Sequence, residues 1–188
     1  YSSVKQFVDL NAKMTQLVTQ AGVSSKWIPD LQKAVLDIGQ TTGQSFNDIA
    51  DGMYRIASGT ASWNKGLGAT KKQLKDMTLA VSELNILGNV PAGSQQEQTS
   101  RIMTVLLNAG LKDIGTDPKK ARNLLVGGAG AGDVRLGGLI TGLGRGVLSS
   151  AQAVGLRGKD AVAWMDLMTS MGTTESIAGT YVRSAITN

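Results

Sequence analysis

Residues 135–156, RLGGLITGLGRGVLSSAQAVGL, carry the pattern that decides the fold of this chain. Apolar side chains three or four positions apart lie on one face of a helix. Here they are Leu136, Leu139, Ile140, Leu143, Val147, Ala151 and Val154. Glycines recur every four residues in a neighbouring stripe, although each glycine in a helix costs about 1 kcal/mol relative to alanine. Small residues let another backbone approach closely. We therefore predict one continuous helix with close helix packing or self-association at Gly138, Gly142, Gly146, Ser149 and Ser150.

The glycine-rich segment before this helix, GAGAGD at residues 128–133, has the look of a nucleotide-binding loop but lacks its features. A phosphate-binding loop follows a β-strand and contains GxGxxG at fixed offsets or a GK[ST] triplet. The preceding residues, KKARNLLV, have helical spacing instead, and neither motif is present. We interpret the glycines as packing and turn positions, and no nucleotide or other cofactor is expected.

Helix signals continue along the rest of the chain, and no alternating run of β-branched or aromatic residues predicts a strand. Helices are predicted over residues 4–22, 29–39, 45–59, 70–87, 95–110, 117–128, 136–154, 159–172 and 174–187. Gly39 is expected to end the second helix, and Thr70 and Asp117 are expected to cap the N-termini of two others. Residues 89–94, NVPAGS, read as a loop. The predicted fold class is all-α, a compact domain of eight or nine short helices.

The length of 188 residues is enough for one well-buried core or two small ones. We expect a single helical domain over residues 1–188, with two sub-units, 1–90 and 95–188, as the alternative division. A weak internal echo favours repeated helical architecture. It aligns Gly43, Asp48, Met53 and Ser58 with Gly155, Asp160, Met165 and Ser170. Because the chain opens with Tyr1 in place of methionine, we expect it to be a fragment of a longer protein.

Histidine and cysteine are both absent, which removes disulfides, thiolate nucleophiles, imidazole acid–base pairs and most transition-metal sites. Two carboxylate pairs remain, Asp48 with Asp51 and Asp113 with Asp117, which would meet on adjacent turns if helical. Such pairs are usually solvated or cap helices. We therefore expect no catalytic residue, no metal site, no small-molecule substrate and no enzymatic activity.

The net charge of +5 is spread along the chain, with the densest basic groups in residues 71–75 and 112–122. A solvated helix face explains such groups better than a dedicated DNA surface does. Trp63 lies in the polar, glycine-rich GTASWNKGLG, where it is either an interface anchor or lipid-surface contact, or a ring that caps the core beside a loop. The candidate partner surface is Trp63, Lys71, Lys72 and Lys75. Trp164, between Val162 and Met165, is predicted to lie in the core.

The apolar segments are too short or too charged to predict a membrane span. A spanning helix needs roughly 18 or more apolar residues without charges. The nearest candidate, residues 134–156, contains Arg135 and Arg145.

The order of elements over residues 115–186 resembles the globular helical domain of the tail tape measure proteins of long-tailed bacteriophages. The matching elements are a helix that ends in a glycine-bearing loop, a helix with small residues, the step Ala151 to Gly155, and an alanine- and methionine-rich helix from Ala161 to Met171. A final helix contributes Gly172, Ala178, Thr180, Arg183 and Ile186. The resemblance covers residues 95–187 well and residues 8–60 more loosely, and residues 64–94 have no counterpart in it.

The resemblance implies a structural role in tail assembly, tail length determination and occupancy of the tail channel before DNA ejection. It implies a homo-oligomer that contacts tail tube proteins, tail-tip proteins and tail assembly chaperones, with passing contact with DNA or host membrane. It places the protein in the interior of the phage tail, in the host cytoplasm during assembly, and in the host envelope during ejection. Two alternatives stay open: a helical membrane-active or pore-forming module, and a basic helical DNA-binding domain.

Overall fold

The described part of the chain is built from helices and loops and contains no strand. The computed structural model describes residues 2–66, 68–90, 94–131 and 134–188. The predicted all-α fold class is confirmed. The chain divides into two compact units, Tyr1–Ile86 and Leu87–Asn188. The division falls at the last turn of a helix, ahead of the predicted 89–94 loop, of which residues 91–93 lie outside the described residues.

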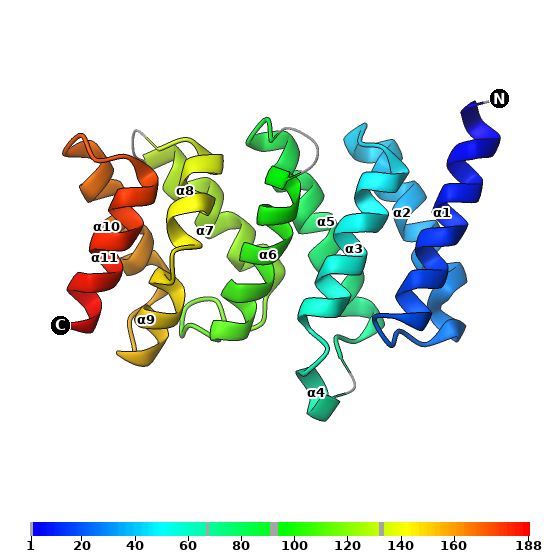
Figure 1. Ribbon diagram of the computed structural model, residues 1–188, viewed down its shortest axis with the longest axis horizontal. Coiled ribbons are helices and arrows are strands. Elements are labelled where there is room, and N and C mark those ends of the chain that lie inside the picture. Colours follow the sequence, from blue (N-terminus) through cyan, green and yellow to red (C-terminus); the bar gives the residue numbers. More distant parts are fainter. Residues whose placement is uncertain (1, 67, 91–93, 132–133) are drawn as a thin grey trace. The chain divides into compact units, whose positions relative to one another are not determined.

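The first unit is a group of helices gathered around α3 (Figure 1). Its elements are α1 (Ser2–Thr19), a 3₁₀ turn η1 (Ser25–Trp27), α2 (Ile28–Thr42), α3 (Phe46–Gly59), α4 (Trp63–Gly66) and α5 (Lys71–Leu87). Both α1 and α2 pack on α3. From α1, Leu10, Met14 and Leu17 are buried, at the three- and four-residue spacing that a helix needs to present one face.

The second helix ends at Thr42, three residues later than predicted, because Gly39 is an interior position of α2. Gly39 is buried, and a Cβ atom there would lie 2.5 Å from Cε1 of the Phe46 ring. The glycine therefore makes room for that ring. The C-cap residue of the helix is Gly43, which has a left-handed φ of +72° and donates its N–H to the carbonyl of Gly39 at 2.8 Å.

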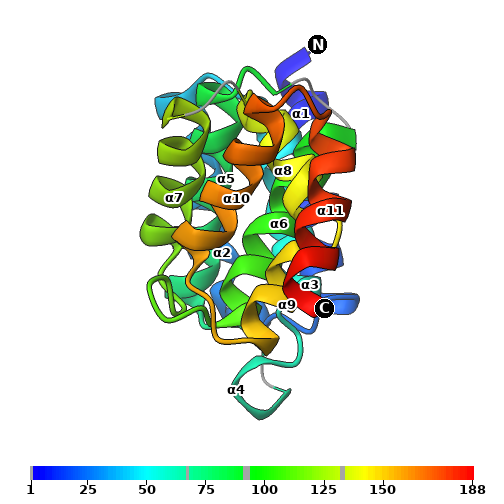
Figure 2. The ribbon, with the colours of Figure 1, turned by 90° about the vertical axis from the view of Figure 1, so that its left-hand side faces the viewer.

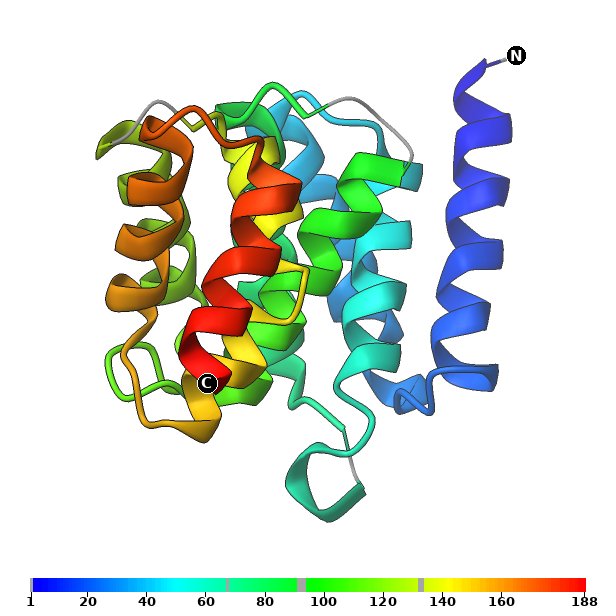
Figure 3. The ribbon, with the colours of Figure 1, turned by 60° about the vertical axis from the view of Figure 1, so that its left-hand side comes forward.

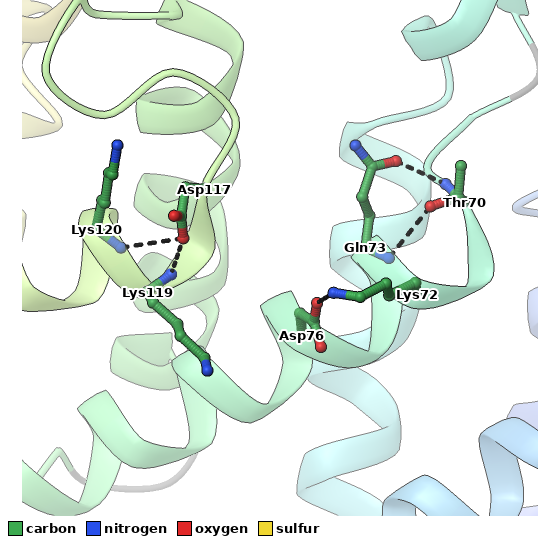
Figure 4. Close-up of polar contacts among 7 residues, drawn as sticks. All are labelled: Thr70, Lys72, Gln73, Asp76, Asp117, Lys119 and Lys120. Carbon is green, nitrogen blue, oxygen red and sulfur yellow. Dashed lines mark hydrogen bonds and ion pairs between the residues drawn. The ribbon is translucent and has the colours of Figure 1, made fainter.

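The two predicted N-caps, Thr70 and Asp117, are confirmed (Figure 4). At the start of α5, the Thr70 hydroxyl accepts the Gln73 N–H at 3.2 Å, while the Gln73 side chain accepts the Thr70 N–H at 2.9 Å. This reciprocal pair is a capping box. At the start of the helix over residues 118–131, Oδ1 of Asp117 accepts the N–H groups of Lys119 and Lys120 at 2.9 and 3.3 Å. Local side-chain chemistry thus defines both helix starts.

The described residues of the second unit form a packed group of six helices in which α11 lies against α8, α9 and α10. The elements are α6 (Ser94–Ala109), α7 (Pro118–Ala131), α8 (Leu136–Leu143), α9 (Val147–Ala153), α10 (Gly158–Ser170) and α11 (Glu175–Thr187). Figure 2 shows α8, α10 and α11 side by side, with α7 next to α10. α6 packs on α7, α8 and α9.

The prediction of one continuous helix over residues 136–154 is wrong, because the helix is interrupted between α8 and α9. The N–H groups of Gly144 and Arg145 bond back to Ile140 and Gly142 at 3.0 Å each, which closes α8. Gly146 then takes a left-handed φ of +92°, a conformation that a helix interior does not contain. This split, together with the short α4, raises the number of helical segments among the described residues from the expected eight or nine to eleven.

The residues of the weak internal repeat occupy equivalent structural positions in the two units. Gly43 and Gly155 are both left-handed, with φ of +72° and +73°. Two residues after each glycine comes an extended N-cap residue, Ser45 before α3 and Arg157 before α10. The same backbone path therefore leads into both helices.

The packing of these two helices is also equivalent. Met53 and Met165 occupy the same position in α3 and α10, and both are fully buried. α1 packs on α3 in the first unit as α7 packs on α10 in the second. The next connection differs: residues 60–70 of the first unit include α4, which projects beyond the end of α3 (Figure 3), whereas residues 171–174 make a short turn. The first unit thus carries an insertion on a shared helical plan.

Candidate helix-packing site and partner surface

The closest helix contact at the predicted glycines is between the backbones of α8 and α11. A Cβ atom on Gly179 of α11 would lie 2.2 Å from the carbonyl oxygen of Gly142 and 2.9 Å from its carbonyl carbon. A Cβ atom on Gly142 would lie 2.7 Å from the carbonyl oxygen of Glu175. Because these atoms belong to the main chain, they cannot move aside without moving a helix. Glycine is therefore required on both sides of the contact.

Gly138 faces the same helix one turn earlier, but it contacts a side chain. A Cβ atom at Gly138 would lie 2.4 Å from Oε1 and 2.7 Å from Cγ of Glu175. Glu175 is in the first turn of α11, where a negative charge interacts favourably with the helix dipole. Gly138 therefore leaves room for the carboxylate that begins α11.

The other three predicted contact residues do not continue this stripe. Gly146 lies in the break between α8 and α9, with the Arg183 side chain beside it. Ser149 is exposed, and its hydroxyl donates to the Gly146 carbonyl at 3.0 Å. Ser150 is buried within α9. The structure therefore brings Gly138 and Gly142 together against α11, and it places Gly146, Ser149 and Ser150 in and after a turn.

Sequence reasoning missed the glycines that complete the packing of this unit. Gly179 is the partner of Gly142, and a Cβ atom at Gly128 of α7 would lie 2.3 Å from Cγ1 of Val162 in α10. The available signal was a single glycine inside an otherwise helix-forming segment, TESIAGTYVRSAIT. Such a glycine costs helix stability unless another element approaches closely.

The N-terminus of α10 is capped from a distant loop by Asp113. The two carboxylate oxygens accept the N–H of Gly158 at 2.7 Å and the N–H of Lys159 at 3.0 Å. A Cβ atom at Gly158 would lie 2.6 Å from Cδ1 of Ile114, so the loop also packs tightly there. These bonds satisfy two of the N–H groups that a helix start leaves without partners. Asp113 thus holds the α6–α7 loop on α10.

A local ion pair supports the same helix start. The Asp160 carboxylate accepts the backbone N–H of Arg157 at 3.2 Å and two guanidinium N–H groups at 2.8 and 2.9 Å. The hydrogen bond from the Arg157 side chain lowers the pKa of Asp160, and the same bond raises the pKa of Arg157. The two-point contact fixes the backbone turn that precedes α10.

Replacing Asp113 by alanine is expected to lower the free energy of unfolding by about 1–2 kcal/mol, the usual cost of losing a helix cap. The loss arises because the N–H groups of buried Gly158 and exposed Lys159 lose their acceptor, and the larger share is expected from Gly158. Urea denaturation followed by circular dichroism measures it. Asp37→Ala, at an exposed position of α2, is the control and should change stability by less than about 0.5 kcal/mol. Equal effects of the two substitutions would contradict the capping role.

The carboxylates considered as pairs in the sequence have separate structural partners. Asp51 forms an ion pair with Lys13, and Asp48 lies in the first turn of α3, where its N–H bonds to the Ser45 hydroxyl at 3.1 Å. Asp113 and Asp117 each cap a different helix. Among residues 2–66, 68–90, 94–131 and 134–188, no three histidine, cysteine or acidic side chains gather in a possible metal site.

The candidate partner surface lies in the first unit, at α4 and the start of α5. Trp63 begins α4 and is half-buried. Lys71 forms an ion pair with Asp30 of α2, and Lys72 pairs with Asp76 one turn along α5 (Figure 4). The hydrogen bond from Lys71, followed by its charge and the charges of Lys75 and Lys33, lowers the pKa of Asp30. Lys71 and Lys75 therefore act on one carboxylate of α2, whereas Lys72 pairs within α5.

The prediction that Trp164 lies in the core is wrong, because the side chain is 45% exposed. The buried face of α10 consists of Gly158, Ala161, Val162 and Met165. Trp164 is turned away from that face and shares its side of the helix with Leu167, which is also exposed. Its neighbours in the sequence are apolar, but one position along a helix is a rotation of about 100°.

Over the described ranges of the chain, no helix has both the length and the apolar character needed to cross a membrane. The family described as phage-related minor tail protein matches residues 32–188, which is most of the chain. No curated protein and no solved structure matches it significantly. The chain therefore belongs to the phage-related minor tail protein family, and it is a structural, virion-associated protein of the phage tail.

Proposed function

We propose that this chain is the folded helical domain of a tail tape measure protein. In this role it takes part in tail assembly and length determination, and it occupies the tail channel before DNA ejection. The observation that carries the proposal is the order of helical elements over residues 115–186, which lies inside the region that matches the minor tail family. The shared plan of the two units adds support, since long tail proteins of this kind are built mainly from helices.

The size of the domain defines its part in such a protein. A continuous helix of 188 residues would span about 280 Å at about 1.5 Å per residue. The described residues form short helices packed into compact units instead, so they extend the chain far less. The domain is thus a folded body at one point along the tape, and the ruler is the helical remainder of a longer parent chain.

The proposed role is non-catalytic and depends on contacts. Asp113 and Asp117 cap helices, and Asp51 forms an ion pair with Lys13. The proposed partners are further copies of the chain, tail tube and tail-tip proteins, and assembly chaperones. The surface that carries Trp63, Lys71, Lys72 and Lys75 is the proposed contact region of the first unit.

Tail length is the property that tests the proposal. Deleting about 100 residues in frame from the helical sequence that flanks this domain in the parent gene should shorten the tail by about 150 Å, at about 1.5 Å per residue. Electron microscopy of the particles measures the length, and the intact mass of the parent polypeptide establishes that a flanking sequence exists. The control is a deletion of the same size in another tail structural gene.

Two outcomes contradict the tape measure role. One is a parent polypeptide of about the size of this chain, which leaves no sequence for a ruler. The other is a set of particles whose tails keep their full length after the flanking deletions. Either result would leave the chain as a minor tail component that acts at one end of the tail.

A further inference from the structure

The first unit contains an apolar cavity that packing within the unit leaves open. Its volume is about 510 Å³. It is lined by Ala21, Gly22, Val23, Ser24, Trp27, Ala57, Gly68, Ala69, Thr70 and Leu74. Most of these residues are small, so the walls are largely backbone and methyl groups, with the Trp27 ring and Leu74 as the large apolar surfaces. The volume lies within the range of about 300–1,000 Å³ that is usual for small-molecule sites.

One wall of the cavity comes from the insertion that distinguishes the two units. Gly68, Ala69 and Thr70 follow α4, in the connection that is a short turn over residues 171–174 of the second unit. The opposite walls come from the α1–α2 connection and from Ala57 near the end of α3. The second unit makes the corresponding connection with a short turn over residues 171–174. The longer connection of the first unit therefore contributes a cavity wall that this turn is too short to provide.

Three lysines are sequence neighbours of residues that line the cavity, and one of them bridges α5 and α2. Lys26 immediately precedes the lining residue Trp27, Lys71 follows Thr70, and Lys75 follows Leu74. Lys71 forms an ion pair with Asp30, which joins the start of α5 to the start of α2. The charges of Lys75 and Lys33 also act on Asp30.

An apolar cavity next to positively charged side chains suits a ligand that has an apolar body and a negatively charged group. Three lysines, Lys33, Lys71 and Lys75, act on the single Asp30 carboxylate of α2, so this edge of the first unit keeps a net positive charge that attracts anions and repels cations. The cavity interior offers few polar atoms and therefore favours an alkyl or aromatic group. An amphiphilic anion satisfies both parts at once.

We propose that the cavity binds one anionic amphiphile per chain. The apolar part lies between Trp27, Leu74 and the inserted residues 68–70, which line the cavity. The anionic head lies against Lys71 and Lys75 of α5, which follow the lining residues Thr70 and Leu74. This binding site is independent of the tail-length role, so either proposal can fail while the other stands.

Calorimetric titration of the 188-residue chain with sodium decanoate, below its critical micelle concentration, tests the proposal. We expect one site per chain. Decyltrimethylammonium has the same tail with the opposite charge, and butyrate has the same head with a short tail. Both should bind at least about tenfold more weakly than decanoate, because each lacks one of the two matching features.

Substitutions locate the site. Ser24 is exposed and its side chain caps no helix, so Ser24→Phe is expected to fill the cavity and weaken decanoate binding at least about tenfold. Ala21→Leu is a second substitution that adds a side chain inside the cavity. If circular dichroism shows that Ser24→Phe disturbs the fold, decanoate binding is measured on the Ala21→Leu protein instead, with the same expected loss. Lys71→Gln with Lys75→Gln should weaken binding by roughly threefold to tenfold, the usual range for two exposed charge contacts.

The matched control is Lys119→Gln with Lys120→Gln, which removes the same charge from α7 of the second unit. It should leave decanoate binding unchanged. Equal binding of the anionic and cationic amphiphiles would overturn the proposal, as would full binding by folded Ser24→Phe and Ala21→Leu proteins. Equal weakening by the two lysine pairs would show that net charge alone attracts the anion, and it would overturn the assigned head-group position.

Discussion

The Gly179→Ala protein is expected to lose about 3 kcal/mol of unfolding free energy, the upper part of the range for adding a group to a packed site. The added methyl group would lie 2.2 Å from the Gly142 carbonyl oxygen, which belongs to the backbone of α8. Relief requires α8 and α11 to separate, and this loosens the neighbouring contacts of α11 with α9 and α10. Urea denaturation of the unsubstituted and Gly179→Ala proteins, followed by far-ultraviolet circular dichroism, measures the difference in their unfolding free energies.

Gly127→Ala is the matched control for this substitution. Gly127 lies within α7, is exposed, and a Cβ atom there would meet nothing within 4 Å. The same chemical change should therefore raise the unfolding free energy by about 0.5–1 kcal/mol, because alanine restricts the unfolded chain and favours the helix. Effects of the same sign and size at both positions would mean that α8 and α11 do not meet through their backbones.

Met53→Ala and Met165→Ala are each expected to lower the unfolding free energy by about 2–5 kcal/mol. Both side chains are fully buried in equivalent positions of α3 and α10, so each truncation removes apolar contacts and leaves a cavity. Met53→Leu and Met165→Leu keep most of the volume and should each cost less than about 1.5 kcal/mol. Thermal and urea denaturation of the four variants measure these differences.

Met171→Ala is the surface control for the methionine pair. Met171 is 72% exposed, so its truncation should change stability by less than about 0.5 kcal/mol. The equivalence of the two units predicts that Met53→Ala and Met165→Ala have costs of the same order. The equivalence would be refuted if one of the two buried substitutions lowered the unfolding free energy strongly and the other changed it no more than Met171→Ala does.

The starts of α5 and α7 were predictable because their causes are local. Thr70 and Asp117 bond to N–H groups two or three residues ahead, so their role is visible in a short stretch of sequence. The ends and breaks depended on distant contacts. Gly39 lies inside a helix because the Phe46 ring packs against it, whereas Gly146 breaks a helix at a spacing that suits a continuous stripe. Sequence spacing alone does not separate these two uses of glycine.

The candidate helix-packing site was also predictable only in its local part. Gly138 and Gly142 could be singled out from their spacing, but the identity of the opposing helix could not, since Gly179 is 37 residues further along the chain than Gly142. The cavity of the first unit was beyond sequence reasoning for a related reason. Its walls come from three separate segments, and its volume is set by the way those segments pack. The lysine group was visible in the sequence, but its position beside the cavity was not.

The cap that Asp113 provides for α10 also changes how fast two backbone amides exchange with solvent. The first N–H groups of a helix have no partner inside the helix and normally exchange their hydrogens with water quickly. Here the N–H groups of Gly158 and Lys159 are bonded to a carboxylate from another loop. Their exchange must await release of that loop, so these two amides should report loop opening directly in deuterated solvent.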